Sequence, residues 1–345
     1  MKNTTVGVDL AKNVIQVCVC KNTKVVSNTE LTHHEFLEWL FNTQSTTIVF
    51  EACSTSNYWK QKALEAGHSA HLISAKLVST VRQNQKTDKN DALAIVQASF
   101  LPDINLIKGK TVEQQQLQVV MRLRELAVKQ KTASSNQLKA LLLEFNIRVS
   151  TRNGGLGGAI KSVLEDAENG FSMAFRQALD TAWSHHLSIV KSISTYGICL
   201  EQSVEQNTDC KRLLKLEGVG TINAINLYLA LGCADLGTFK KGKDAAACIG
   251  LTPIQYSSGG KTKQGNIGKH VKNSLLRSQL ITGAMSVVFR VTKRDAVTKK
   301  DAWIQALAER RGKKCAAVAL ANKTVRTAFA MLAQDNEYKA ELLTA

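Results

Sequence analysis

The order of short β-rich runs in the first 75 residues constrains the fold of this chain more than any other feature. Residues 4–8, 14–20 and 24–28 are β-rich and separated by turn-like residues, which predicts three antiparallel strands. The elements expected after them are a helix at 32–42, a strand at 48–50, a helix at 58–66, a strand at 70–74 and a helix at 88–100. This order predicts a mixed α/β domain in which helices pack on a sheet.

Four acids stand at the ends of these elements. Asp9 follows the first strand, and Glu51 directly follows the strand at 48–50. Asp88 and Asp91 are three residues apart at a helix start, so both lie on one face of that helix. Singly, each has an ordinary explanation, because acids are favoured at helix N-termini and acids at strand ends are usually solvated. Together they predict one cluster at a sheet edge, where Mg²⁺ or Mn²⁺ would offset the repulsion and assist phosphoryl transfer.

The net charge of +17 is distributed unevenly. Residues 239–323 hold 18 basic and 4 acidic residues, whereas residues 1–105 hold 10 and 9. This pattern suggests a polyanion that is gripped by one part of the chain and cut by another. Aromatic residues make up only 6% of the chain, so base stacking is not an evident main mode of binding. The late basic residues expected to contact phosphate as a group are Arg277, Arg290, Lys293, Arg294, Arg310, Arg311, Lys313 and Lys314.

The cysteines and the apolar runs indicate where the protein resides. None of the eight cysteines forms a C-x-x-C pair or has a histidine at zinc-ligand spacing, which favours reduced, buried thiols. No apolar run reaches the roughly 18 residues that a membrane helix needs. The N-terminus enters a strand directly, without a signal-peptide core. We therefore expect a cytoplasmic protein with no membrane partner.

Helical periodicity dominates the middle of the chain. Residues 111–146 lack Pro and Gly and predict a long helix, and a second helical stretch covers about 159–196. The glycines at 153–158 are interpreted as a hinge, because no Gly-Lys-Ser/Thr ending follows them. Pairing of the two stretches predicts a coiled-coil arm. The expected domains are 1–105, 106–204 and 205–345.

Two further features lie in the last of these domains. Gly218-Val219-Gly220 has the form of a helix-hairpin-helix turn, after which a helix N-terminus offers N–H groups to phosphate. The alternative is a plain helix–Gly–helix corner with no role in binding. Pro253 is expected to lead rigidly into a loop with Ser257 and Ser258 before two glycines and near Lys261 and Lys263. A serine in such a place is usually a plain loop residue, and chemistry alone does not choose between the two serines.

These motifs resemble those of a known family. Gly7-Val8-Asp9, Phe50-Glu51-Ala52 and the run from Thr87 to Ala92 look like the DEDD motif of the RuvC-like domain in IS110-type insertion-sequence transposases. Piv-type DNA invertases share that motif. The run from Pro253 to Lys261 looks like the serine motif of the same family, in which the nucleophile stands five residues after the proline, here Ser258. Family members commonly have serine in place of Gly268 and arginine in place of His270.

The resemblance implies both a fold and a mechanism. The fold is α/β plus α: an RNase H-like (RuvC-like) mixed-sheet domain, a coiled-coil arm, and a mainly helical C-terminal domain with a helix-hairpin-helix. The implied activity is that of a DNA transposase or site-specific recombinase, which acts on element ends and target DNA. The acids hold the divalent metal, and the serine forms a covalent phosphoserine intermediate. A guide RNA, a homo-oligomer (dimer or tetramer) and a site shared between subunits are also implied. The expected nucleic-acid contacts are Lys261, Lys263, Lys269 and Arg277.

Two alternatives remain open at this stage. One is a RuvC-like, metal-dependent junction nuclease in which water rather than serine attacks the phosphate. The other is a nucleic-acid-binding protein with no catalytic activity, in which the acids serve only local structure.

Overall fold

The structure is a computed structural model that describes residues 4–102, 104, 106, 107, 109–232, 239–268 and 274–342. Residue contacts divide the chain into two compact units, Met1–Gln114 with Asp209–Ala345, and Gln115–Thr208. Within the first unit, the N-terminal and the C-terminal segments have separate hydrophobic clusters, so we describe each segment by itself. Among the described residues, no helix has both the length and the apolar character needed to cross a membrane.

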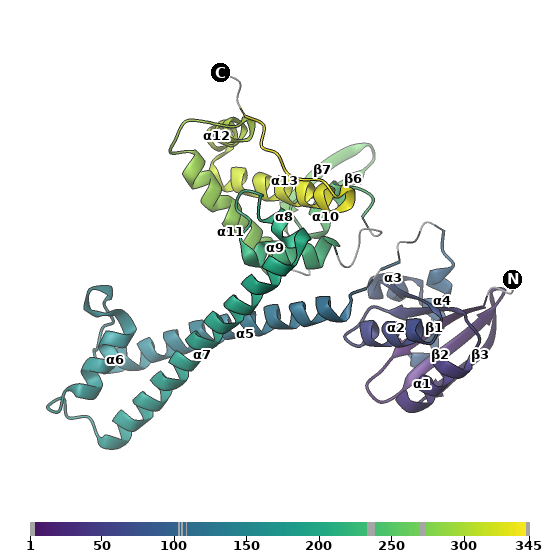
Figure 1. Ribbon diagram of the computed structural model, residues 1–345, viewed down its shortest axis with the longest axis horizontal. Coiled ribbons are helices and arrows are strands. Elements are labelled where there is room, and N and C mark those ends of the chain that lie inside the picture. Colours follow the sequence, from purple (N-terminus) through teal and green to yellow (C-terminus); the bar gives the residue numbers. More distant parts are fainter. Residues whose placement is uncertain are drawn as a thin grey trace. The chain divides into compact units, whose positions relative to one another are not determined.

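The N-terminal segment contains a five-stranded sheet (Figure 1). Its strands are β1 (Thr4–Leu10), β2 (Ile15–Lys21), β3 (Lys24–Leu31), β4 (Thr47–Glu51) and β5 (Ser69–Ile73). The order across the sheet is β3-β2-β1-β4-β5, with β1, β2 and β3 antiparallel and β1, β4 and β5 parallel. This arrangement confirms the predicted mixed sheet, and every strand expected from the sequence is present.

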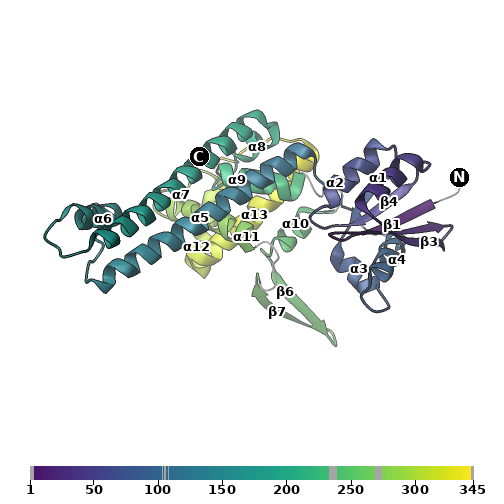
Figure 2. The same ribbon diagram turned by 90° about the horizontal axis from the view of Figure 1, so that it is seen from below.

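Helices cover both faces of this sheet, with α1 and α2 on one side and α3 and α4 on the other (Figure 2). Their bounds are α1 (His33–Asn42), α2 (Ser56–Glu65), α3 (Ala75–Val81) and α4 (Asp88–Ser99). Val8 and Phe50 pack in the cluster that contains Phe36 of α1, while Val49 packs with Ile95 of α4 on the opposite face. The sequence analysis placed no helix between the strand at 70–74 and the helix at 88–100, but α3 lies there.

Gly7 lets α4 lie directly against the sheet. A Cβ at this position would lie 2.4 Å from the carbonyl oxygen of Ala92 and 2.5 Å from Cγ2 of Val96. Both distances are shorter than real Cβ contacts, so any larger residue would push the helix away from β1. Because residues two apart on a strand share a face, Asp9 points to the same side as Gly7, toward α4.

The unit Gln115–Thr208 consists mainly of two long helices, α5 (Val112–Glu144) and α7 (Met173–Gln206), with the shorter α6 (Gly155–Glu165) between them. Leu138 and Leu142 of α5 pack with Ile160 of α6 and Leu179 of α7. The Oγ of Ser134 lies 2.7 Å from Nδ1 of the buried His186, which joins α5 to α7.

Two details of this unit differ from the sequence prediction. Residues 166–172 interrupt the helical stretch expected at 159–196, whereas the long helix expected at 111–146 is confirmed. The glycine turn is centred on Gly154, which has a left-handed φ of 74°, and Gly155 already begins α6. The pairing of α5 with α7 as a coiled coil stays a prediction.

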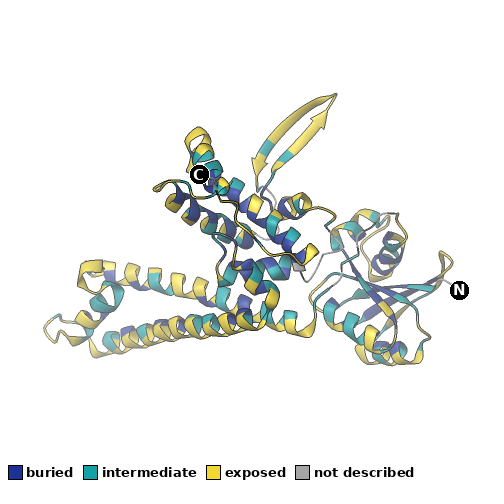
Figure 3. Cartoon of the chain, turned by 45° about the horizontal axis from the view of Figure 1, so that its top comes forward, coloured by how far each residue is buried: buried dark blue, intermediate teal, exposed yellow. Residues whose placement is uncertain are grey.

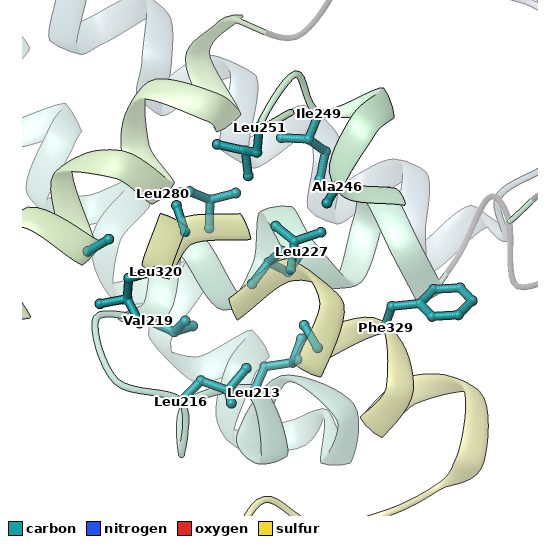
Figure 4. Close-up of a cluster of buried hydrophobic side chains, with 14 of the residues drawn as sticks. Leu213, Leu216, Val219, Leu227, Ala246, Ile249, Leu251, Leu280, Leu320 and Phe329 are labelled. Carbon is teal, nitrogen blue, oxygen red and sulfur yellow. The ribbon is translucent and has the colours of Figure 1, made fainter. Parts of the chain in front are cut away.

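The C-terminal segment packs helices around one apolar core (Figure 4). The elements are α8 (Thr208–Leu213), α9 (Thr221–Leu227), the π-helical turn η2 (Tyr228–Gly232), α10 (Gly242–Cys248), α11 (Ser274–Val291), α12 (Lys299–Arg311) and α13 (Lys313–Gln334). Gly218, at φ 78°, lies so close to Gly283 of α11 that a Cβ on Gly218 would meet the Gly283 carbonyl oxygen at 2.7 Å. The Gly-Val-Gly turn therefore serves packing, and its binding of phosphate stays a prediction.

A two-stranded hairpin extends from this segment, with β6 (Pro253–Ser258) and β7 (Lys261–Ile267) almost wholly exposed (Figure 3). Gly259 and Gly260 form its turn at φ 55° and 76°. Positive φ at both central residues fits the tight turn that matches the twist of a hairpin. The sequence predicted a loop here, but the glycines close a hairpin.

Candidate active site

Two of the predicted acids lie side by side at the carboxyl edge of the sheet. Val8 of β1 pairs in parallel with Phe50 of β4, so Asp9 and Glu51 occupy the next positions on neighbouring strands. Such strands lie about 4.8 Å apart. Because Glu51 shares its face with Val49, both acids project to the side of the sheet that α4 covers.

The first turn of α4 brings the other two acids to this edge. The Thr87 side chain caps the helix by accepting from the Asn90 backbone N–H at 3.3 Å, and Asn90 Nδ2 donates to the carbonyl of Gln85 at 2.8 Å. Asp91 is 8% exposed, whereas Asp88 is exposed. Capping was the ordinary explanation for these acids, yet the Thr87 side chain performs the capping, so neither carboxylate is needed for it.

A polar chain that the sequence did not reveal anchors this turn. Gln16, which is 1% exposed and pairs with Asp9 across β2 and β1, donates to Asn28 at 2.8 Å. Asn28 in turn donates to the carbonyl oxygen of Lys89 at 3.0 Å. These contacts hold the start of α4 against β2 and β3, so they position Asp88 and Asp91. Their only sequence signal is a polar residue inside an apolar strand.

The four carboxylates interact electrostatically. Burial, followed by the charges of Asp91, Asp88 and Glu51, raises the pKa of Asp9 to about 6. Burial and the Asp91 carboxylate also raise the pKa of Glu51, while Lys86 and Arg82 partly oppose that rise. Burial and neighbouring negative charge therefore disfavour ionisation of Asp9 and Glu51, which is the condition that a bound cation relieves.

Arg82 is the internal counter-ion of this cluster. Its Nη1 donates to Oδ1 of Asp91 at 2.7 Å, and the two side chains are 23% and 11% exposed. Arg82 follows α3 directly, so the helix that the sequence analysis missed also places this guanidinium.

The residues fit a hard divalent cation in donor chemistry. Asp9, Glu51, Asp88 and Asp91 supply only carboxylate oxygens, the ligands that Mg²⁺ and Mn²⁺ prefer. Within the part of the chain that the structure describes, no three acidic, cysteine or histidine side chains are arranged closely enough to hold a metal ion as they stand. Arg82 occupies Oδ1 of Asp91, so a cation bound to that oxygen would compete with this ion pair.

The register of the hairpin distinguishes the two candidate serines. Ser258 pairs with Lys261, and Tyr256 pairs with Lys263. Directly opposed residues and residues two apart share a face, so Ser258 lies on the same face as both lysines. Ser257 pairs with Thr262 on the other face.

Arg277 has a structural partner at the base of the hairpin. Its Nε donates to the carbonyl of Gly250 at 3.0 Å, and Nη2 lies 3.5 Å from that of Ile267. A Cβ on Gly268 would lie 2.3 Å from Cζ of Arg277, so serine at 268 requires this arginine to move. The predicted contact of Arg277 with nucleic acid stays a prediction, and Lys269 and His270 lie outside the described residues.

Comparison with known proteins places this arrangement in a family. Residues 6–147 match the DEDD domain of IS110 transposases, and residues 210–299 match the domain described as transposase IS116/IS110/IS902 family. The transposase for insertion sequence element IS1111A of Coxiella burnetii (strain RSA 493 / Nine Mile phase I) is 31% identical over 334 residues, which cover 96% of this chain and 90% of that protein. The chain belongs to the IS116/IS110/IS902 family of transposases.

Other similarities are more distant. The pilin gene-inverting protein of Moraxella bovis is 24% identical over 305 residues, which cover 84% of each protein. The structural match to the Thermus thermophilus RuvC structure covers 28% of this chain and 91% of the RuvC chain, with a TM-score of 0.23 and 12% sequence identity. Membership of the transposase family confirms the predicted role in DNA transposition and recombination at that general level.

Proposed function

We propose that this transposase cuts and rejoins DNA through a metal-assisted serine nucleophile. Asp9, Glu51, Asp88 and Asp91 hold Mg²⁺ or Mn²⁺, and Ser258 attacks the scissile phosphate. The observation that carries the metal part is the gathering of four acids at the edge formed by β1, β4 and the start of α4, with a raised pKa at Asp9. The shared face of Ser258 and Lys261 supports the nucleophile.

The serine step conserves the energy of the broken bond. The Ser258 hydroxyl loses its proton as Oγ bonds to phosphorus, and the bond from phosphorus to the leaving strand oxygen breaks as that oxygen gains a proton. Lys261, on the same face, would stabilise negative charge on the phosphate. In the reverse sense, a hydroxyl of the incoming strand attacks the phosphoserine and restores the free serine, so rejoining needs no ATP. A divalent ion held by the acids supplies charge neutralisation at the phosphate.

A denaturing gel tests this proposal. The protein is incubated with element-end DNA, candidate guide RNA and Mg²⁺, and a DNA–protein band that survives denaturation is expected. Ser258→Ala should abolish the band, Ser257→Ala should retain it, and Asp88→Asn or Asp91→Asn should lower it. Full strand cleavage by Ser258→Ala would instead support the water-using nuclease. Unchanged biological activity in both aspartate variants would support a non-catalytic binder.

The proposal includes an element-encoded guide RNA and a homo-oligomer in which subunits share a site. Both are supported by family membership. Mixing Ser258→Ala subunits with Asp91→Asn subunits tests the shared site, because each supplies the group that the other lacks. Recovery of the DNA–protein band is expected, whereas no recovery in a mixed oligomer would require serine and acids from one chain.

A further inference from the structure

A cavity of about 1210 Å³ lies among the C-terminal helices. Its walls are the start of α10, the base of the β6–β7 hairpin and one face of α13, with Trp303 and Phe329 in the lining. We call it the basic groove, after the six cations that line it: Lys240, Lys241, Lys243, Lys314, Lys323 and Arg326. Among the described residues, no acidic side chain lines it.

These six cations differ from five other basic residues of the same segment. Those five are paired with acids: Arg212 with Asp209 and Asp335, Lys215 with Glu337, Arg294 with Asp301, Lys299 with Glu341, and Lys300 with Glu217. The groove cations are all exposed, and within the described ranges none takes part in an ion pair. Lys323 lies 5.0 Å from the centre of the Trp303 ring. Six positive charges therefore share one groove, and none of the described acidic side chains compensates them there.

The dimensions of the groove favour a polymer over a small anion. Lys314 and Arg326 are 12 residues apart on α13. At 1.5 Å per residue, the helix carries this charge over about 18 Å. The volume also exceeds the roughly 300–1,000 Å³ of ordinary small-molecule pockets. A ligand with regularly repeated negative charges satisfies both observations.

We propose that the basic groove binds the phosphodiester backbone of a nucleic-acid strand that the transposase handles, an inference that rests on the proposed function for its biological substrate. Pro253 and Ile267 pair at the base of the hairpin and also line the groove. Ser258 stands five residues beyond Pro253, or about 17 Å along the strand. A strand bound in the groove thus runs next to the element that carries the serine.

The salt dependence of binding tests this inference. Fluorescent single-stranded RNA, single-stranded DNA and duplex DNA of equal length and sequence are titrated with the whole protein at several salt concentrations. The double variant Lys314→Gln/Arg326→Gln removes two phosphate contacts, so the slope of log affinity against log salt should fall by about 1.4 for a single strand or about 1.8 for a duplex. The probe whose salt slope falls in this way identifies the kind of nucleic acid that the groove binds.

The matched control is Lys211→Gln/Lys339→Gln, which removes the same charge from exposed positions that do not line the groove. Its slope should equal that of the parent protein. Thermal unfolding verifies that both double variants are folded. An unchanged slope in the groove variant, equal falls in both variants, or a parent protein that binds none of the three probes would overturn the inference.

Cys315 gives an independent and local readout. It is exposed and lines the groove, whereas the exposed Cys199 lies on α7. Bound nucleic acid should slow alkylation of Cys315 severalfold and leave Cys199 at its original rate, and the groove variant should lose this protection. Equal alkylation of Cys315 with and without nucleic acid would contradict the inference.

The two proposals fail in different ways. If the groove variant shows the reduced salt slope while the parent forms no DNA–protein adduct, the basic groove stands and the serine mechanism falls. If the parent forms the adduct while the groove variant keeps the parental slope and the protection of Cys315, the serine mechanism stands and the groove falls.

Discussion

Arg82 and Asp91 form a largely buried ion pair in which Nη1 lies 2.7 Å from Oδ1. This guanidinium engages an oxygen that a divalent ion would use, so Arg82 and metal compete for Asp91. Arg82→Gln should therefore bind Mn²⁺ roughly tenfold more tightly, since a charged hydrogen bond contributes about 1.5–3 kcal/mol. Without metal the same variant should lose on the order of 2 kcal/mol of stability, because it leaves a buried carboxylate unpaired.

Calorimetric titration with Mn²⁺ and denaturation in EDTA measure the two effects of Arg82→Gln. The control is Arg122→Gln, which removes an exposed arginine of α5 and should change neither quantity. Weaker Mn²⁺ binding by Arg82→Gln would show that Arg82 supports the metal site instead of competing with it.

The raised pKa of Asp9 predicts how stability depends on pH. Its folded-state pKa of about 6 lies above the ordinary value of 3.8, so the folded protein holds this proton more tightly. The free energy of unfolding should therefore fall as pH rises from about 4 to about 6, and then level off. Asp9→Asn should remove that fall and stabilise the metal-free protein at pH 7 by roughly 1–2 kcal/mol, allowing for solvent screening of a half-buried group.

Urea denaturation in EDTA across this pH range measures the effect. Asp180→Asn, at an exposed acid of α7, should leave the fall in place. If the free energy of unfolding of Asp9→Asn falls by the same amount over this pH range, the fall must come from groups other than Asp9.

The contact between Gly7 and α4 predicts a coupled loss of stability and metal binding. A methyl group at Gly7 would press on Ala92 and Val96, so Gly7→Ala should cost about 2–3 kcal/mol and shift the first turn of α4. Mn²⁺ affinity should fall together with stability. Gly197→Ala in α7, where no atom lies within 4 Å of the added carbon, should be neutral or stabilising by up to about 1 kcal/mol. Unchanged Mn²⁺ affinity in Gly7→Ala would dissociate α4 placement from the metal site.

The face that Lys261 shares with Ser258 predicts a rate effect. Lys261→Gln should slow formation of the DNA–protein adduct by about 10²-fold, the usual loss for one group that stabilises developing charge in a transition state. Thr262→Val alters the opposite face and should leave the rate near that of the parent. Single-turnover kinetics at saturating DNA measure both variants, and equal rates would exclude Lys261 from the chemistry.

The sequence predicted the sheet well because its signals are local. Strands β1 to β5 are apolar runs between turn residues, and Asp9 and Glu51 mark the ends of two of them. The helix at 88 was expected within one residue of its end. The parallel pairing of β1 with β4 places Asp9 beside Glu51, and the start of α4 adds Asp88 and Asp91 at the same edge.

The features that sequence reasoning missed depend on tertiary contacts or on an ambiguous signal. Helix α3 has only seven residues, and Val78 is its only buried residue among those described, so its apolar pattern is too short to identify a helix. The ion pair of Arg82 with Asp91 could not be predicted, because it depends on where α3 places Arg82. The glycines after Ser258 do signal a hairpin turn. The strands on either side are polar and exposed, so they lack the alternation of apolar and polar residues that identifies a half-buried strand.

The most direct measurement maps the covalent link between DNA and protein. After incubation with element-end DNA, guide RNA and Mg²⁺, nuclease and trypsin digestion should leave a nucleotide on the peptide of residues 244–261, and fragmentation should place it on Ser258. The yield of this modified peptide should fall when Asp91→Asn replaces the parent protein. A nucleotide on Ser257, or complete cleavage with no modified peptide, would contradict the account.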